Sequence, residues 1–306
     1  MKNRNFKIGL ALGGGGARGL AHVGIIQVLE REGVPIDFIA GTSVGSVVGA
    51  FYALYKDSKR LQTAAQELAK KMNQYQSHLD FTQFKTENKK VLPWGKLTEF
   101  IKKGFFLHTE LRKTCLNDGV MMKKMFTEVL GTHQFCETEL PFIAVAADLI
   151  SGKEVHLDEG DLIPALMASC AIPGVFPPVQ HHKQLLVDGG IIDNVPIEAV
   201  RRMGADFVIA SNITRELKRK IKYKNAIDIL LRSEEITSKK LRQIQIEKSD
   251  FVISPGIHHI DWWNFSKPEQ CMSLGEEAAN KAIKELQHAI KKKRMKTRWK
   301  KLLIKY

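Results

Sequence analysis

Short apolar runs alternate with longer amphipathic stretches along most of this chain. Apolar runs predict strands near residues 7–12, 37–41, 142–148, 185–188, 206–211 and 250–254. Helical spacing of apolar positions predicts helices near 20–31, 44–55, 59–72, 119–130, 161–169, 196–203, 225–247 and 271–292. Because strands that alternate with helices are typical of sheets covered on both faces, we expect an α/β fold. The pattern predicts three layers, α/β/α, around a mostly parallel central sheet.

A serine lies between two glycines where the second predicted strand meets a helix. The sequence Gly41-Thr42-Ser43-Val44-Gly45 fits the G-x-S-x-G elbow. A serine in this turn needs a strained backbone, and side chains at positions 41 and 45 would clash with the turn. The hydroxyl is then exposed at a helix N-terminus, where the dipole favours developing negative charge. The motif makes Ser43 a candidate nucleophile, and a plain Gly/Ser turn before a tightly packed helix fits this pattern equally well.

A glycine-rich loop, Gly13-Gly14-Gly15-Gly16-Ala17-Arg18-Gly19, follows the first predicted strand. Consecutive glycines allow close approach of a ligand, and their N–H groups can converge on an anion at a helix N-terminus. In a serine hydrolase such a loop forms the oxyanion hole, which holds the negative oxygen of the tetrahedral intermediate. A loop that only lets strand and helix pack closely is the plainer alternative.

A nucleotide site competes for the same glycines. Gly14, Gly16 and Gly19 fit the G-x-G-x-x-G dinucleotide fingerprint, and Asp37 lies near the distance expected of a ribose-binding acid. Two details weaken this interpretation. Asp37 begins the second predicted strand instead of ending it, and the nucleotide leaves Ser43 without a role.

A serine nucleophile needs a base, and Asp188 is the best candidate. It ends the apolar run Leu185-Leu186-Val187 and precedes Gly189 and Gly190, which let another backbone pass close by. Ligand chemistry in open α/β sheets lies outside the carboxyl ends of strands, so we expect Asp188 and Ser43 at one edge. A carboxylate that contacts a serine hydroxyl can take its proton directly. An ordinary Asp-Gly turn is the alternative.

Taken together, these motifs resemble the patatin-like phospholipase family, in particular its bacterial cytoplasmic members. The glycine loop with Arg18 and Gly19, the elbow from Gly41 to Gly45, and Asp188-Gly189-Gly190 occur in the family's order. Further segments that fit are 146–149 with Ser151-Gly152, 168–178 and 191–196. Gly13 is a departure, because plant members usually carry an aspartate there.

The resemblance covers residues 6–290 and implies one patatin-like acyl hydrolase domain. It implies a Ser43–Asp188 dyad that hydrolyses fatty-acyl esters of phospholipids or lysophospholipids through an acyl-enzyme. Gly14, Gly15 and Gly16 would be the oxyanion donors. The expected chemistry requires no metal and no organic cofactor. A non-catalytic regulator built on the hydrolase scaffold remains an alternative.

Residues 72–135 interrupt the alternation of strands and helices. The segment is Lys-rich and is punctuated by the aromatic residues Phe81, Phe84, Trp94, Phe100, Phe105 and Phe106. We expect a helical insertion that could form a lid and supply acyl-chain contacts. Amphipathic helices whose aromatic side chains face the core explain the pattern equally well.

Charge is concentrated at the C-terminal end. The chain has a formal net charge of +14, and residues 291–306 hold nine Lys and Arg with no acid. Apolar side chains such as Trp299 and Leu302 are interleaved with these charges, which favours peripheral contact with an anionic membrane. A solvated, frayed basic terminus is the alternative. No nucleic-acid motif accompanies the charge, so no nucleic-acid partner is expected.

Cysteine usage and hydropathy indicate a cytoplasmic protein. The four cysteines are widely spaced, with no C-x-x-C pair, which suits a reducing compartment and argues against zinc and disulfides. No signal peptide and no apolar stretch of membrane-spanning length is recognised. Oligomeric state does not follow from the sequence.

Overall fold

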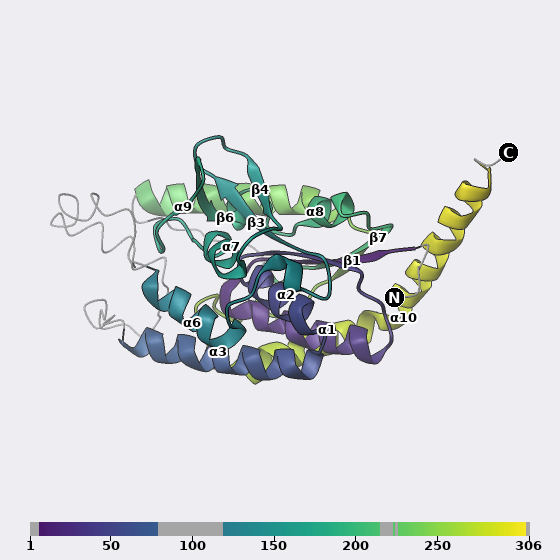
Figure 1. The fold of residues 1–306 in the computed structure, drawn as a ribbon, viewed down its shortest axis with the longest axis horizontal. Helices are drawn as coiled ribbons and strands as arrows, with labels where there is room; N and C mark the ends of the chain where they lie inside the picture. Colours follow the sequence, from purple (N-terminus) through teal and green to yellow (C-terminus); the bar gives the residue numbers. More distant parts are fainter. Residues whose placement is uncertain (1–5, 79–118, 215–222, 224–225, 304–306) are drawn as a thin grey trace.

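A mixed sheet between two helical layers forms the body of the protein (Figure 1). The computed structural model describes residues 6–78, 119–214, 223 and 226–303. Within these residues the parallel strands are β1 (Ile8–Leu12), β2 (Phe38–Thr42), β3 (Phe142–Asp148), β7 (Phe207–Ser211) and β8 (Phe251–Ile253), in the order β3-β2-β1-β7-β8. Antiparallel strands β4 (Glu154–Leu157), β5 (Val179–His181) and β6 (Gln184–Asp188) extend the sheet around β3.

Helices cover both faces of the sheet. On one face lie α1 (Ala21–Arg31), α2 (Val44–Tyr55), α3 (Ser58–His78), α6 (Val120–Leu130), α7 (Leu162–Ser169) and α10 (Pro268–Leu303). On the other lie α8 (Ile197–Arg202) and α9 (Ala226–Ile246), drawn above the sheet in Figure 1. Short 3-10 turns are η1 (Gly16–Leu20), η3 (Phe135–Glu137) and η4 (Gly189–Ile191).

The period-two alternation of the strands divides the core into two unequal parts. In β1, Leu10 and Leu12 point into the larger cluster with α1 and α2, whereas Ala11 faces the cluster under α8. β3 repeats the pattern, with Phe142 and Ile143 on opposite faces. Both faces are buried, and the central strands are therefore apolar almost throughout.

The three-layer α/β prediction is confirmed, and all six predicted strands are present. The sequence did not reveal β4 and β5, since both are short and only partly buried, with polar residues such as Glu154 and Gln180. The sheet is less parallel than expected, because β6 runs antiparallel to β3. The antiparallel direction of β6 places Asp188, its last residue, opposite Ala146 of β3.

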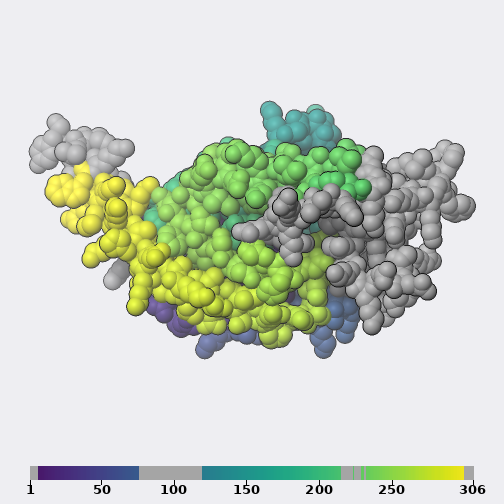
Figure 2. Space-filling view, turned by 180° about the vertical axis from the view of Figure 1, so that it is seen from behind, coloured from purple at the N-terminus to yellow at the C-terminus, as the bar shows by residue number. Residues whose placement is uncertain are grey.

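The basic C-terminal segment is a continuous helix. α10 crosses residue 290 without a break and ends at Leu303, because Lys and Arg are good helix formers. An ion pair from Lys293 to Asp250, 2.8 Å, ties it to the start of β8. Beyond that contact the helix stands clear of the body, as Figures 1 and 2 show. Within the described ranges, no helix has an apolar stretch long enough to cross a bilayer.

Most of the predicted insertion lies outside the described residues. Its two ends are visible as the last turns of α3 and as α6, where Met72, Met122 and Phe126 are buried. The lid therefore stays a prediction, as does the division into residues 6–290 and 291–306.

Candidate active site

Ser43 occupies a strained turn between β2 and α2. Its φ of 55° and ψ of −129° lie in a region that side-chain-bearing residues rarely adopt. The flanking glycines permit this turn. A Cβ at Gly41 would lie 2.3 Å from the Gly45 carbonyl oxygen, and one at Gly45 would lie 2.2 Å from the Leu12 carbonyl oxygen. The elbow geometry expected from the sequence is present.

Strand register brings Asp188 to the elbow. Val145 pairs with Thr42 of β2 and with β4, whereas Ala146 pairs with Asp188 of β6 and with β4. A strand has only two hydrogen-bonding edges, so β2 and β6 must share the edge opposite β4. They approach from opposite directions and end at neighbouring positions of β3. Asp188 thus lies beside the residue after Thr42, and the reason is antiparallel pairing instead of a shared carboxyl edge.

The Asp188 carboxylate is buried, with 6% of the residue exposed. Its Oδ1 accepts a hydrogen bond from the Gly190 N–H at 2.8 Å. Burial raises the pKa of Asp188 to about 6, and the hydrogen bonds from the Ser43 side chain and the Gly190 amide act in the opposite direction. A Cβ at Gly189 would lie 2.5 Å from the Val145 carbonyl oxygen, which explains glycine after the aspartate. A carboxyl group with this pKa is a stronger base than an exposed one and is still ionised at neutral pH.

The glycine loop is held by two backbone–backbone hydrogen bonds and one from a side chain. The Gly13 N–H donates to the Ser211 oxygen at 3.1 Å, and the Gly14 N–H donates to the Asn194 oxygen at 3.0 Å. The His22 Nε2–H donates to the Gly13 oxygen at 2.8 Å. Because its N–H is already used, Gly14 does not meet the expectation of an oxyanion donor. Among the described residues no acceptor is recorded for the amides of Gly15 and Gly16, so these remain the candidate donors.

Arg18 and Gly19 shape the same loop. The Arg18 Nε–H donates to the Gly15 oxygen at 3.2 Å, across the turn that presents the glycine amides. A Cβ at Gly19 would lie 2.2 Å from the Val44 side chain at the start of α2. These motif residues thus fit a role in packing the glycine loop against the elbow.

His22 is a site residue that the sequence did not single out. It is fully buried, and the Gly13 oxygen can only accept, so Nε2 carries the proton and Nδ1 accepts from the Ser211 hydroxyl at 2.7 Å. Burial lowers the pKa of His22 to about 4 from its ordinary 6.5. A lone histidine at a helical position has no distinctive spacing, so the sequence pattern does not mark it as a site residue.

Acidification is expected to weaken the fold through His22. The unfolded chain protonates this histidine below about pH 6.5, but the folded protein does so only near pH 4. Stability from the neutral histidine is therefore lost as pH falls through this window. At pH 5 the loss is about 2 kcal/mol relative to pH 8. Urea unfolding of the wild type and of His22→Gln at both pH values measures this loss of free energy.

The change in unfolding free energy between pH 8 and pH 5, compared between wild type and His22→Gln, isolates the contribution of His22. Burial also raises the pKa values of Asp188 and of Asp193, the latter to about 8, and these acids stabilise the folded state as pH falls. Their contributions cancel between wild type and variant. The assignment is wrong if the stability gap between wild type and His22→Gln is the same at pH 8 and pH 5.

Asp37 does not support a nucleotide site. Its carboxylate accepts hydrogen bonds from the Ile8 N–H at 2.9 Å and from the Lys7 side chain at 3.4 Å. These contacts brace the amino ends of β1 and β2, whereas the glycine loop follows the carboxyl end of β1. The acid that would bind a ribose is therefore engaged at the opposite edge of the sheet.

An apolar cavity opens beside Ser43. It has about 70 Å³ of free space, and aromatic, aliphatic and sulfur-containing side chains dominate its walls. The lining residues are Gly16, Ser43, Val44, Val47, Leu68, Met72, Met122, Phe126, Cys170, Ile172, Phe176, Trp262, Trp263 and Phe265. The Trp262 carbonyl also accepts the Ala17 N–H at 2.6 Å, so the loop before α10 closes over the glycine loop. The cavity suits an apolar chain attached to a group that reacts at Ser43.

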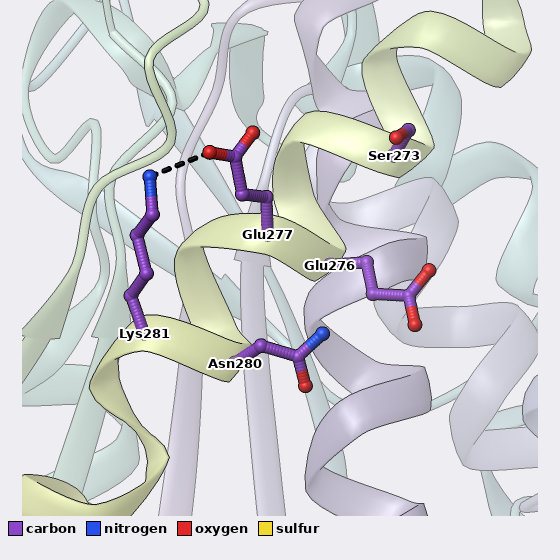
Figure 3. A pocket seen from close by; sticks show the side chains of 5 residues that line it. All are labelled: Ser273, Glu276, Glu277, Asn280 and Lys281. Carbon is purple, nitrogen blue, oxygen red and sulfur yellow. Dashed lines mark hydrogen bonds and ion pairs between the residues drawn. The ribbon is translucent and has the colours of Figure 1, made fainter.

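A larger hollow, of about 420 Å³, lies on α10 away from this site (Figure 3). Polar side chains of one helix line it, and its carboxylates are already paired. Glu277 binds Lys281 at 2.5 Å, as the dashed line in Figure 3 marks, and Glu276 binds Arg31 at 2.9 Å. It has neither a strained serine nor a buried acid. Within the described part of the chain, no cluster of three or more His, Cys, Asp or Glu could hold a metal ion.

The fold and the turn at Ser43 define an α/β protein of the nucleophile-elbow type. Comparison with known proteins gives the particular family. The sequence profile described as "Patatin-like phospholipase" matches residues 10–201, which is more than half of the chain. The chain belongs to the patatin-like phospholipase family.

Relatives in animals, fungi and bacteria share this region. Patatin-like phospholipase domain-containing protein 6 of Mus musculus is 34% identical over 209 residues, which are 67% of this chain and 13% of that protein. An uncharacterized NTE family protein of Mycobacterium tuberculosis is 33% identical, over 68% of this chain and 49% of that protein. Lysophospholipase nte1 of Aspergillus fumigatus is 30% identical, over 67% and 12% respectively. The chain thus spans half or less of the length of these relatives.

Proposed function

We propose that this protein is a serine hydrolase that cleaves fatty-acyl esters of lipids, with Ser43 as nucleophile and Asp188 as base. The observation that best supports the proposal is strand register: β2 and β6 end at neighbouring positions of β3, β2 just before Ser43 and β6 at Asp188, and an apolar cavity lies beside Ser43. Family membership supports ester hydrolysis, and a relative named as a lysophospholipase supports a lipid substrate.

The proposed reaction has two halves. Asp188 takes the Ser43 proton while the hydroxyl oxygen attacks the acyl carbonyl, and the amides of Gly15 and Gly16 stabilise the oxyanion. Asp188 then returns the proton to the leaving alcohol, which leaves the acyl group on Ser43. Water gives a proton to Asp188 as it attacks the acyl-enzyme, and Asp188 passes that proton to the Ser43 oxygen as the acyl bond breaks and the fatty acid leaves. No step in this scheme requires a cofactor.

The lining of the cavity supports an acyl chain as the group next to Ser43. Met72 of α3 and Met122 and Phe126 of α6 are among the lining residues, and methionine adapts its shape to flexible chains. The aromatic side chains Trp263 and Phe265, which also line the cavity, come from the loop before α10. A phospholipid or lysophospholipid would place its acyl carbonyl at Ser43 and its headgroup outside.

A fluorophosphonate probe tests the proposal directly. It reacts with an activated serine, and mass spectrometry locates the adduct. We expect labelling of wild-type protein at Ser43, none in Ser43→Ala, and unchanged labelling in Asp37→Asn. A protein that stays unlabelled, or is labelled elsewhere, contradicts the proposal and favours the non-catalytic regulator. Saturable dinucleotide binding that is indifferent to Ser43→Ala would favour the nucleotide alternative.

We also propose that the basic end of α10 tethers the protein to anionic membranes. Lys296, Arg298 and Trp299 are exposed there, the tryptophan at 67%, on the segment that stands clear of the body. About 35 Å of helix separates Pro268, near the cavity, from Lys291, at 1.5 Å per residue. The segment therefore acts as a tether remote from the cavity.

Charge reversal in the tether is expected to release the protein from anionic vesicles. Each basic residue near such a surface contributes about 1 kcal/mol. The double variant Lys296→Glu/Arg298→Glu should thus bind vesicles of phosphatidylserine and phosphatidylcholine at least about tenfold more weakly in a pelleting assay. Lys239→Glu/Lys240→Glu on α9 makes the same change in net charge and should bind like the wild type. Equal loss in both variants would mean that net charge, and not the tether, governs binding.

A further inference from the structure

The end of α7 and the turn that follows it contact both residues of the proposed dyad. Ser169, the last residue of the helix, is completely buried, and its Oγ accepts a hydrogen bond from the Ser43 N–H at 3.0 Å. Two residues later, the Ala171 oxygen accepts the N–H of Asp188 at 2.9 Å. One short turn thus holds the backbone of nucleophile and base together.

Ser169 also anchors this turn to the sheet. Its hydroxyl donates to the Val145 oxygen at 2.7 Å. A hydroxyl group has one proton and two lone pairs, so it can donate to Val145 while it accepts from Ser43. Val145 is the residue of β3 that pairs with Thr42, just before the elbow. The contact therefore links the strained turn to the position where β2 ends.

The backbone N–H and the backbone carbonyl of Ser43 are held by unequal numbers of hydrogen bonds. Its carbonyl oxygen accepts from the Ser46 hydroxyl at 2.6 Å, the Ser46 N–H at 2.8 Å and the Val47 N–H at 3.4 Å. For its N–H, the one acceptor recorded among the described residues is the Ser169 hydroxyl. A backbone at φ 55° persists only where its surroundings impose it. Loss of the Ser169 hydroxyl would leave a buried N–H unpaired at the most strained residue of the site.

We propose that Ser169 is a positioning residue, whose hydroxyl holds the Ser43 backbone in the conformation that aims its side chain at Asp188. This inference rests on the proposed function of Ser43. It predicts that Ser169 affects the reactivity of Ser43 and does not affect the apolar cavity that would bind the acyl chain.

Ser46 provides a matched control. It is also a completely buried serine whose hydroxyl bonds to the Ser43 backbone, but on the carbonyl that keeps two other donors. Ser169→Ala and Ser46→Ala each remove one hydroxyl from this backbone. We expect Ser169→Ala to slow fluorophosphonate labelling of Ser43, and kcat for a soluble p-nitrophenyl ester, by about 10- to 100-fold. KM should change less than about twofold, and Ser46→Ala should keep both rates within about twofold of wild type.

A second pair of variants covers the case in which Ser169→Ala does not fold. Thr and Val have the same shape and differ by the hydroxyl, so Ser169→Thr should retain labelling and Ser169→Val should lose it at least about tenfold. Thermal unfolding of each variant separates loss of reactivity from loss of fold. The inference is overturned if Ser169→Ala labels at the wild-type rate, if Ser169→Val labels like Ser169→Thr, or if both alanine variants lose rate equally. Wild-type protein that fails to label at Ser43 would overturn the proposed function instead.

Discussion

Ser43→Ala is expected to lower kcat for lysophospholipid or p-nitrophenyl ester hydrolysis by at least about 10⁴-fold. Removal of a nucleophilic serine leaves only the rate due to substrate binding and oxyanion stabilisation, which is a small remainder. KM should stay near the wild-type value, because the hydroxyl adds nothing to the apolar walls that hold the acyl chain. Steady-state kinetics on purified wild type and variant measure both parameters.

A glycine at the same position provides an internal check. Ser43 has a φ of 55°, which glycine adopts without the cost that a Cβ imposes. Ser43→Gly should therefore be as inactive as Ser43→Ala yet more stable by about 1 kcal/mol in urea unfolding. Activity above about 1% of wild type in either variant, with contaminating hydrolases excluded, would contradict a nucleophilic Ser43.

Asp188→Asn is expected to lower kcat by about 10³- to 10⁴-fold and to abolish the acid limb of the pH profile. Burial raises the pKa of Asp188 to about 6, and a base works only when deprotonated. Wild-type kcat/KM should therefore be level above about pH 7 and should fall tenfold per pH unit well below pH 6. The profile of kcat/KM between pH 4.5 and 8.5 measures this limb.

Asp193→Asn is the matched control for Asp188. Asp193 is also buried, and its pKa is raised to about 8 by burial, with a smaller contribution from Glu154. Its backbone carbonyl contacts Thr42, but its carboxyl group has no recorded bond to Ser43 among the described residues. Asp193→Asn should keep the limb near pH 6. A limb that persists in Asp188→Asn, or disappears in Asp193→Asn, would show that another group acts as the base.

Several parts of the site were predictable because their cause is local. The turn at Ser43 requires glycine at positions 41 and 45, since a Cβ there would meet the backbone at 2.3 and 2.2 Å. Because only glycine fits at such positions, the requirement can be recognised in the sequence itself. The same holds for Gly189 next to Val145. Asp188 was likewise visible as the polar end of an apolar strand.

Other parts depend on contacts between distant segments and have no local mark. The Gly14 amide is occupied by the carbonyl of Asn194, which lies 180 residues later, so counting glycines alone could not separate it from Gly15 and Gly16. His22 and Ser169 are polar residues on the buried sides of their helices, a pattern shared by many structural residues. Trp262 and Trp263 reach the cavity from a loop outside the matched family region.

The sequence by itself determined most of the strands and helices, the strained elbow, the glycine loop and the family, because local sterics and hydrophobic periodicity act over a few neighbouring residues. Tertiary structure alone decided how the site closes. β6 runs antiparallel to β3 and ends against β2, and the end of α7 holds the backbone at both Ser43 and Asp188. Strand direction and pairing arise from long-range contacts and burial, which a single strand of five residues does not encode.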